Sequence, residues 1–170
     1  RRARSAQVEQ EGNPVRQDLV DLADKRQAGL DFYGLAPHKK TIVVMGGSLG
    51  ARTMNEAVEF ASELLKANEH VQVLWQIGKL YMRQYADSTA AQLSNVHALE
   101  FLTKMDYAYA VADLVVARAG ALTISEVCVA GVPVILVPSP HVAEDHQTKN
   151  AESLRSVGAA ILIKDSEAKE

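Results

Sequence analysis

The 170-residue sequence is poor in cysteine, in aromatic residues and in long apolar runs. A single cysteine, Cys128, rules out an internal disulfide, which is compatible with a reducing compartment. Aromatic residues make up 5% of the chain and the formal net charge is −3, so we expect neither a base-stacking platform nor a basic nucleic-acid binder. No apolar run approaches the roughly 20 residues of a membrane-spanning helix, and no signal peptide is recognisable.

The chain has enough apolar residues to form a hydrophobic core, since 48% of its residues are hydrophobic. Residues 1–11 are polar and arginine-rich, and we interpret them as a flexible arm or an expression remnant. Residues 12–170 are expected to form one domain, with residues 29–40 as a surface approach to the first strand. Residues 165–170 read as the start of a further helix, so the sequence predicts a piece of a larger protein.

From Thr41 onward, short apolar runs alternate with helical patterns. Strands are predicted at 41–45, 71–75, 96–99, 114–117, 134–137 and 160–163. Helices are predicted at 51–65, 81–93, 105–112, 122–130 and 146–157. Continuous Val/Ile/Leu strands separated by helices indicate a parallel sheet covered on both faces, hence a doubly wound, Rossmann-like α/β domain. In such a sheet, ligands bind outside the carboxyl ends of the strands.

A glycine-rich turn, Gly46-Gly47-Ser48-Leu49-Gly50, joins the first predicted strand to the first long helix. Glycines permit a tight turn, and a helix start offers unpaired N–H groups and a positive dipole end to a phosphate. The turn is neither the G-x-G-x-x-G fingerprint of dinucleotide sites nor a P-loop. A plain strand-to-helix turn capped by Ser48 is the alternative interpretation.

The segment from Arg118 to Glu126 repeats this geometry at a later strand. Gly120 lets the backbone approach a ligand, Thr123 and Ser125 add hydroxyl donors, and Glu126 adds a carboxylate suited to sugar hydroxyls. Two such turns at separate strand ends of one sheet are suited to holding a diphosphate between them. The alternative for Glu126 is an ordinary carboxylate that the helix dipole stabilises.

The helix that follows carries an apolar pattern with helical spacing. Leu122, Val127, Cys128 and Ala130 are expected to share its buried face. We therefore interpret Cys128 as core filling and not as a nucleophile, because no activating histidine or lysine is adjacent in the sequence.

Polar residues also cluster after the strand predicted at 134–137. Gln147 and Asn150 are three residues apart, so they share a helix face and both could hydrogen-bond a sugar ring. The spacing of His141 and His146 does not suit a metal site on one helix face. Near the start of the chain, Arg16 could clamp a phosphate or a base edge, with a solvated surface arginine as the alternative.

Taken together, these segments resemble the MurG family, the bacterial undecaprenyl-diphospho-muramoylpentapeptide N-acetylglucosaminyltransferases. The resemblance rests on blocks in the same order at 12–16, 46–52, 100–102, 118–126 and 130–133, continuing to 146–147 and 150–151. It covers nearly everything from Gly12 onward, and the arm at residues 1–11 does not contribute to it.

This resemblance implies one half of a two-domain GT-B glycosyltransferase, the C-terminal domain that binds UDP-N-acetylglucosamine. The N-terminal domain, which receives the lipid-linked acceptor, and the final helices would be absent. The implied reaction is inverting transfer of N-acetylglucosamine to lipid I, giving lipid II for peptidoglycan, at the cytoplasmic face of the inner membrane. No cofactor or metal is implied. No catalytic residue is assigned here, and the fragment alone is expected to be inactive.

Roles carry over from the family residue by residue. Ser48 and Thr123 would lie near the diphosphate, Arg16 beside the nucleotide, the main chain of Leu102 at the uracil edge and Glu126 at the ribose. Gln147 and Asn150 would face the N-acetylglucosamine hydroxyls. The implied binding set is Arg16, Ser48, Leu102, Ala121, Leu122, Thr123, Ile124, Ser125, Glu126, Gln147 and Asn150. Two positions depart from the family: Leu49 stands where many relatives have Gln, and His146 where some have a second Gln.

Two other functions compete with this one. A UDP-N-acetylglucosamine 2-epimerase would use the same donor without an acceptor, and a non-catalytic nucleotide-binding module would only regulate a partner. A nicotinamide dehydrogenase is disfavoured because the dinucleotide fingerprint is absent.

Overall fold

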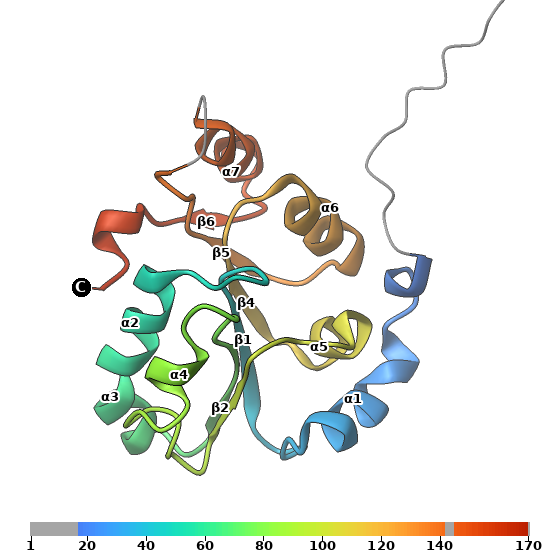
Figure 1. Cartoon of the computed structure of the whole chain (residues 1–170). Helices are drawn as coiled ribbons and strands as arrows, with labels where there is room; N and C mark the ends of the chain where they lie inside the picture. The colour runs from blue at the N-terminus through green and yellow to red at the C-terminus, as the bar shows by residue number, and fades with distance from the viewer. Residues whose placement is uncertain (1–16, 142–144, 170) are drawn as a thin grey trace, which may run out of the picture.

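The computed structural model describes residues 17–141 and 145–169, and these form an α/β sandwich around one parallel sheet (Figure 1). The six strands follow the order β3-β2-β1-β4-β5-β6, and every neighbouring pair is parallel. Their bounds are β1 Lys40–Met45, β2 Val71–Gln76, β3 Val96–Leu99, β4 Leu114–Ala117, β5 Val134–Leu136 and β6 Ile161–Leu162. The chain runs outward from β1 to β3 and then returns to β4, so the strand order reverses between β1 and β4. That reversal is the topological switch point of a doubly wound sheet.

Helices cover both faces of the sheet (Figure 1). The helices are α1 Arg26–Tyr33, α2 Arg52–Phe60, α3 Ser62–Ala67, α4 Met82–Tyr85, α5 Met105–Val111, α6 Ala121–Ala130 and α7 His146–Ser156. Short 3₁₀ turns lie at Gln17–Leu19, Ala23–Lys25 and Asp165–Glu167. Helices α2 to α4 pack on one face, and α1, α5, α6 and α7 lie toward the other. The predicted Rossmann-like α/β fold is confirmed.

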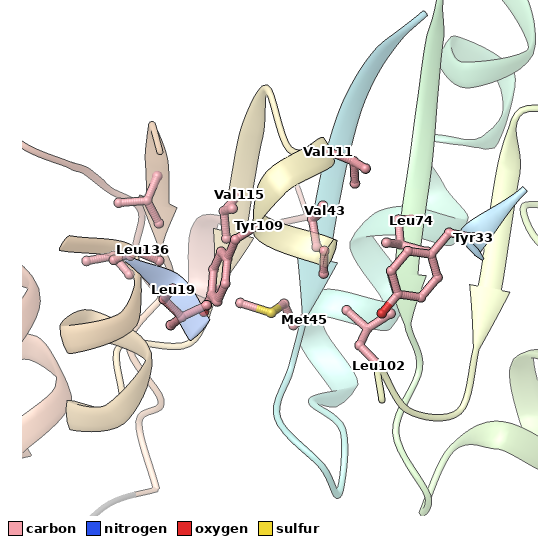
Figure 2. Close-up of a cluster of buried hydrophobic side chains, with 14 of the residues drawn as sticks. Leu19, Tyr33, Val43, Met45, Leu74, Leu102, Tyr109, Val111, Val115 and Leu136 are labelled. Carbon is pink, nitrogen blue, oxygen red and sulfur yellow. The ribbon is translucent and has the colours of Figure 1, made fainter. Parts of the chain in front are cut away.

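The sheet divides the core into two apolar clusters, because successive side chains of a strand point to opposite faces. In β1, Val43 and Met45 belong to the cluster beneath α1 and α5, whereas Val44 belongs to the cluster beneath α2. Figure 2 shows the first of these clusters. Burying a side chain of this size contributes about 1.5–3 kcal/mol, so the two clusters hold the strands in register.

A buried hydrogen-bond chain fixes α2 against β2. The indole Nε1 of Trp75, which is fully buried, donates to Asn55 Oδ1 at 2.9 Å, and Asn55 Nδ2 donates to the Ile77 carbonyl at 2.9 Å. Because Asn55 lies in the first turn of α2, this chain fixes the helix start beside the end of β2. The glycine turn before α2 is thereby held in place.

All six predicted strands are confirmed within one or two residues at their ends, but two predicted helices are wrong in extent. The helix predicted at 51–65 divides into α2 and α3 at Ala61, where ψ is 2°. The helix predicted at 81–93 is only the short α4. Beyond it, the Thr89 and Ala90 amides donate to the Glu59 carboxylate, each at 3.0 Å. That tertiary contact replaces the helical bonds that the sequence pattern suggested.

Residues 29–40, predicted as a surface approach, include most of α1, so that prediction is wrong. Leu30 and Tyr33 are one turn apart and are buried against α5. The Arg26 Nη1 group donates to the carbonyl of Val111 at 3.0 Å, which satisfies the end of α5. A short amphipathic helix followed by polar residues gave too little periodic pattern to distinguish it from a loop.

The apolar face predicted for α6 is also wrong. Val127 is buried, but Leu122 is 50% exposed and Cys128 is exposed. The interpretation of Cys128 as core filling is therefore incorrect. Because α6 is apolar almost all round, hydrophobic periodicity could not indicate which side faces the sheet.

Candidate functional site

A cavity of about 700 Å³ opens at the carboxyl edge of the sheet, around the switch point between β1 and β4. Its walls come from the carboxyl ends of β1 to β5 and the segments that follow them, including Gly47, Gln76, Phe101, Arg118 and Ser139. The cavity lies where the topology rule places a ligand site.

The first glycine turn forms one wall of this cavity. Gly46, Gly47 and Gly50 line it, and Gly50 has a φ of +92°. Gly50 packs so closely against Gly78 that a Cβ atom on Gly78 would lie 2.2 Å from Gly50 Cα. Only glycine fits at this crossing of the two loops. The turn therefore has a fixed shape, with its backbone facing the cavity.

Ser48 lies in this turn but does not cap α2. The N-cap residue is Ala51, and no side chain bonds the first amides of the helix. The interpretation of Ser48 as a helix cap is therefore wrong. Ser48 is exposed, and its carbonyl accepts the Lys79 N–H at 3.1 Å. In the described part of the chain no side chain caps the start of α2, which is the arrangement of a helix start that can bind a phosphate.

The second glycine turn forms the opposite wall. Gly120 is the N-cap of α6, which likewise has no side-chain cap, and Gly120, Leu122 and Thr123 line the cavity. The start of α6 therefore offers unpaired N–H groups together with the Thr123 side chain. Two uncapped helix starts and two glycine turns thus border one cavity, which suits a ligand carrying more than one phosphate.

Glu126 brings a carboxylate to the cavity from the second turn of α6. The residue is 6% exposed, and its Oε2 accepts the Tyr109 hydroxyl at 2.8 Å. A buried carboxylate is costly unless it is hydrogen-bonded, and here one of its two oxygens is satisfied by α5. Tyr109 was not predicted from the sequence, because its apolar surroundings mark it as an ordinary core aromatic.

A network at the far end of the cavity joins Arg118 to the last described turn. Arg118 Nη1 donates to the Val137 carbonyl at 3.2 Å and forms an ion pair with Asp165. Asp165 in turn accepts the Thr53 hydroxyl at 2.9 Å. This network connects β4, β5 and α2 beside the site. Asp165 was not predicted as a site residue, because no pattern around it indicates which strand end it reaches.

Gln147 and Asn150 differ in their placement. Gln147 lines the cavity, and its Oε1 accepts the Ser139 N–H at 2.8 Å, so the start of α7 is tied to the segment after β5. Asn150 lies one turn further along, and its Nδ2 reaches the Ala119 carbonyl at 3.5 Å. Its amide thus contacts the second glycine turn and not the cavity wall itself.

Of the binding set expected from the resemblance, the structure brings Leu122, Thr123, Glu126 and Gln147 together around one cavity. Ser48, Ala121, Ile124, Ser125 and Asn150 belong to the adjoining segments without lining it. The Ser125 hydroxyl donates to the Ala121 carbonyl at 3.0 Å, so it is engaged within its own helix. Arg16 lies outside the described residues.

Leu102 is fully buried, and its N–H donates to Gln76 Oε1 at 3.0 Å. Its amide is therefore occupied, and Leu102 does not line the cavity. The adjacent Phe101 is 50% exposed and lines the cavity instead. Phe101 and Gln76 are site residues that the sequence reasoning missed.

Within residues 17–141 and 145–169, no three His, Cys, Asp or Glu side chains gather where they could hold a metal ion. No helix in that same part of the chain has the length and apolar character to cross a membrane.

The fold and the site together define a Rossmann-like domain with a cavity at the carboxyl edge of its sheet. Residues 41–170 match the family described as "Glycosyltransferase family 28 C-terminal domain", and the chain belongs to this family.

Two relatives are similar over most of the chain. The protein named UDP-N-acetylglucosamine--N-acetylmuramyl-(pentapeptide) pyrophosphoryl-undecaprenol N-acetylglucosamine transferase from Parabacteroides distasonis is 52% identical over 161 residues. The protein of the same name from Cytophaga hutchinsonii is 50% identical over 162 residues. These alignments cover 92% and 94% of this chain but only 43% and 42% of the two relatives. The chain thus spans less than half the length of these curated relatives.

Solved structures show the same fold. The crystal structure of Acinetobacter baumannii MurG aligns with a TM-score of 0.64 at 37% identity, over 81% of this chain and 40% of that one. A putative UDP-N-acetylglucosamine 2-epimerase from Listeria monocytogenes aligns with a TM-score of 0.59 at 16% identity, over 82% of this chain and 36% of that one. The second likeness concerns the fold alone and does not favour epimerase activity.

Proposed function

We propose that this domain binds UDP-N-acetylglucosamine as the donor half of an N-acetylglucosaminyltransferase. The observation that carries the proposal is the 700 Å³ cavity bordered by two uncapped helix starts, with the Glu126 carboxylate in its wall. Support comes from relatives about half identical to the chain, whose names describe this transfer to a pyrophosphoryl-undecaprenol acceptor. The same names suggest that the intact enzyme makes lipid II for peptidoglycan.

Each part of the donor has a candidate partner in the cavity or in the segments beside it. The amides of the two glycine turns, with Thr123 and the nearby Ser48, would hold the diphosphate. Glu126 would accept hydrogen bonds from the ribose hydroxyls, and Gln147 would face the sugar, with Asn150 behind it. The segment after β3 would meet the uracil, where Phe101 lines the cavity and the adjacent Leu102 main chain is buried. These assignments use donors for the negatively charged phosphates and acceptors for hydroxyl groups.

The proposed chemistry is inverting transfer, in which an acceptor hydroxyl attacks the anomeric carbon and UDP departs. Charge that develops on the leaving diphosphate would be stabilised by the fixed N–H groups and dipoles at the starts of α2 and α6. We propose no catalytic base within the described residues. The base and the acceptor site would belong to an N-terminal domain that pairs with residues 12–170.

We further propose that the intact enzyme acts as a peripheral protein at the cytoplasmic face of the bacterial inner membrane. A lipid-linked acceptor resides in the membrane, so the enzyme must meet it there. The relatives' printed names provide the support, because they describe an undecaprenol-linked acceptor.

Calorimetric titration of the chain with UDP-N-acetylglucosamine, UDP-glucose and NADH tests the donor assignment. We expect measurable binding of UDP-N-acetylglucosamine, weaker binding of UDP-glucose and no binding of NADH. No binding of either UDP-sugar at millimolar concentration, or a preference for NADH, would refute the proposal.

Glu126→Ala tests the ribose contact directly. We expect it to weaken UDP binding by about 1–3 kcal/mol, the scale of a lost hydrogen bond to a charged group. Glu152→Ala is the matched control, because Glu152 is paired with Arg155 on the surface of α7, away from the cavity lining. An unchanged UDP affinity in Glu126→Ala would remove Glu126 from the ribose role.

A further inference from the structure

Tyr109 has an unusual place for a tyrosine hydroxyl. It belongs to α5 and is 1% exposed, and its ring lies in the apolar cluster with Leu19, Met45 and Val115 (Figure 2). Its hydroxyl nevertheless donates to Glu126 Oε2, a cavity-lining group on the next helix. A core residue is thereby connected directly to the site.

This bond constrains the direction of the Glu126 carboxylate. An ionised carboxylate only accepts hydrogen bonds, so the tyrosine must be the donor. The tyrosine ring is fixed by close packing, and it therefore holds Oε2 at one place. The other oxygen, Oε1, is the one left to a ligand. A glutamate side chain has three rotatable bonds. Because Tyr109 fixes this side chain before binding, less conformational entropy is lost when the ligand binds.

We propose that Tyr109 is a positioning residue, which orients Glu126 so that its second oxygen accepts hydrogen bonds from the ribose hydroxyls of a uridine nucleotide. This inference rests on the donor-binding function proposed above. It goes beyond that function because it makes ribose recognition depend on a residue that is buried in the core.

The test compares UDP with 2′,3′-dideoxy-UDP, which lacks both ribose hydroxyls. The ratio of the two affinities isolates the ribose contact, because base and diphosphate contacts are common to both ligands. We expect the unmodified chain to favour UDP by about tenfold, the effect of a lost charged hydrogen bond. Tyr109→Phe should reduce that preference several-fold by weakening UDP binding, with the affinity for the dideoxy ligand changed less than about twofold.

Two variants of Glu126 complete the test. Glu126→Gln should reduce the same ratio. The double variant, which also carries Tyr109→Phe, should reduce it little further, because the two changes disrupt the same ribose contact. Glu126→Asp keeps the charge but shortens the side chain, so it cannot reach both Tyr109 and the ribose. We expect a reduced ratio there too, and this variant serves if Tyr109→Phe does not fold.

Tyr33→Phe is the matched control. Tyr33 belongs to the same apolar cluster. Its hydroxyl donates to the Lys104 carbonyl at 2.9 Å and accepts the Lys104 N–H at 3.3 Å, so the variant loses two partly buried hydrogen bonds without touching Glu126. Its UDP-to-dideoxy ratio should equal that of the unmodified chain. A fall of the ratio in Tyr33→Phe as large as in Tyr109→Phe would show a general packing effect and overturn the positioning role.

The remaining outcomes separate the two levels of the inference. A ratio unchanged in Tyr109→Phe but reduced in Glu126→Gln would overturn the role of Tyr109 and leave the donor site intact. Equal binding of UDP and its dideoxy analogue by the unmodified chain would overturn the ribose contact while leaving diphosphate binding. Failure to bind either ligand would refute the proposed function itself, and the role of Tyr109 with it.

Discussion

The Gln76 side chain at the end of β2 donates to the Gly47 carbonyl at 2.8 Å. The Oε1 atom of the same amide accepts the Leu102 N–H at 3.0 Å. Gln76 is 4% exposed; its bond to Leu102 is buried, and its bond to Gly47 is partly buried. One amide therefore joins the glycine turn after β1 to the segment after β3. These two segments are the ones proposed to hold the diphosphate and the base.

Replacement of this amide should loosen both segments. Gln76→Leu removes the two bonds and leaves the Leu102 amide buried without a partner, which costs about 1–3 kcal/mol of unfolding free energy. Urea denaturation would measure the loss. Gln92→Leu, at an exposed position in the segment after α4, is the control and should change stability by less than about 0.5 kcal/mol. Equal effects from the two variants would contradict the linking role of Gln76.

The contact between Gly50 and Gly78 should tolerate no side chain. Gly78→Ala would place a Cβ atom 2.2 Å from Gly50 Cα, at a φ of +89°, so the loops must separate. We expect a loss of more than about 2 kcal/mol in a thermal or chemical melt. Gly34→Ala has a similar φ of +68° but meets no atom within 4 Å, and it should cost only about 1 kcal/mol. A similar loss for both would mean that backbone strain alone matters.

Asn55→Ala should destabilise the chain by removing the polar partner of the only tryptophan. The Trp75 indole N–H and the Ile77 carbonyl would both lose a buried hydrogen bond, at a cost of about 1–3 kcal/mol. The emission of Trp75 during urea denaturation reports the transition. Asn68→Ala is the control, because it removes only a surface hydrogen bond from Asn68 Nδ2 to the Leu64 carbonyl. Its unfolding free energy should fall much less than that of Asn55→Ala.

His97 should make stability depend on pH below neutrality. Burial in β3 lowers the pKa of His97, and the positive charge of Lys39 lowers it further. The folded chain therefore binds the proton less readily than the unfolded chain. The contribution of His97 is fully present above the unfolded pKa of about 6.5, and it is lost as pH falls from there through the lower folded pKa. Unfolding free energies at several pH values, compared with those of His97→Gln, should diverge below that point. Parallel curves would contradict the expectation.

Much of this architecture was predictable because each strand is a short apolar run ended by a polar or glycine-containing turn. The strand ends of β1 and β4, each followed by a glycine-containing turn, also indicated the edge where the cavity lies. The predictions failed where the structure depends on tertiary contacts, which the sequence pattern does not reveal. The Glu59 carboxylate redirects the chain after α4, and the evenly apolar α6 gave no sign that Cys128 would be exposed.

Site residues show the same division. Thr123 and Glu126 stand in a recognisable motif and were predicted, and both line the cavity. Gln76 and Tyr109 lie in apolar segments whose patterns match ordinary core elements. Their importance arises from which backbone or carboxylate group they reach, and periodicity contains no information about that.

The exposure of Cys128 has a practical consequence for measurement. It is the single thiol of the sequence and lies near the end of α6, about one and a half turns beyond Thr123 at the cavity. A thiol-reactive dye or spin label would attach at one known position without mutagenesis. The label would report changes in α6 when a ligand occupies the start of that same helix, without standing in the way of the ligand.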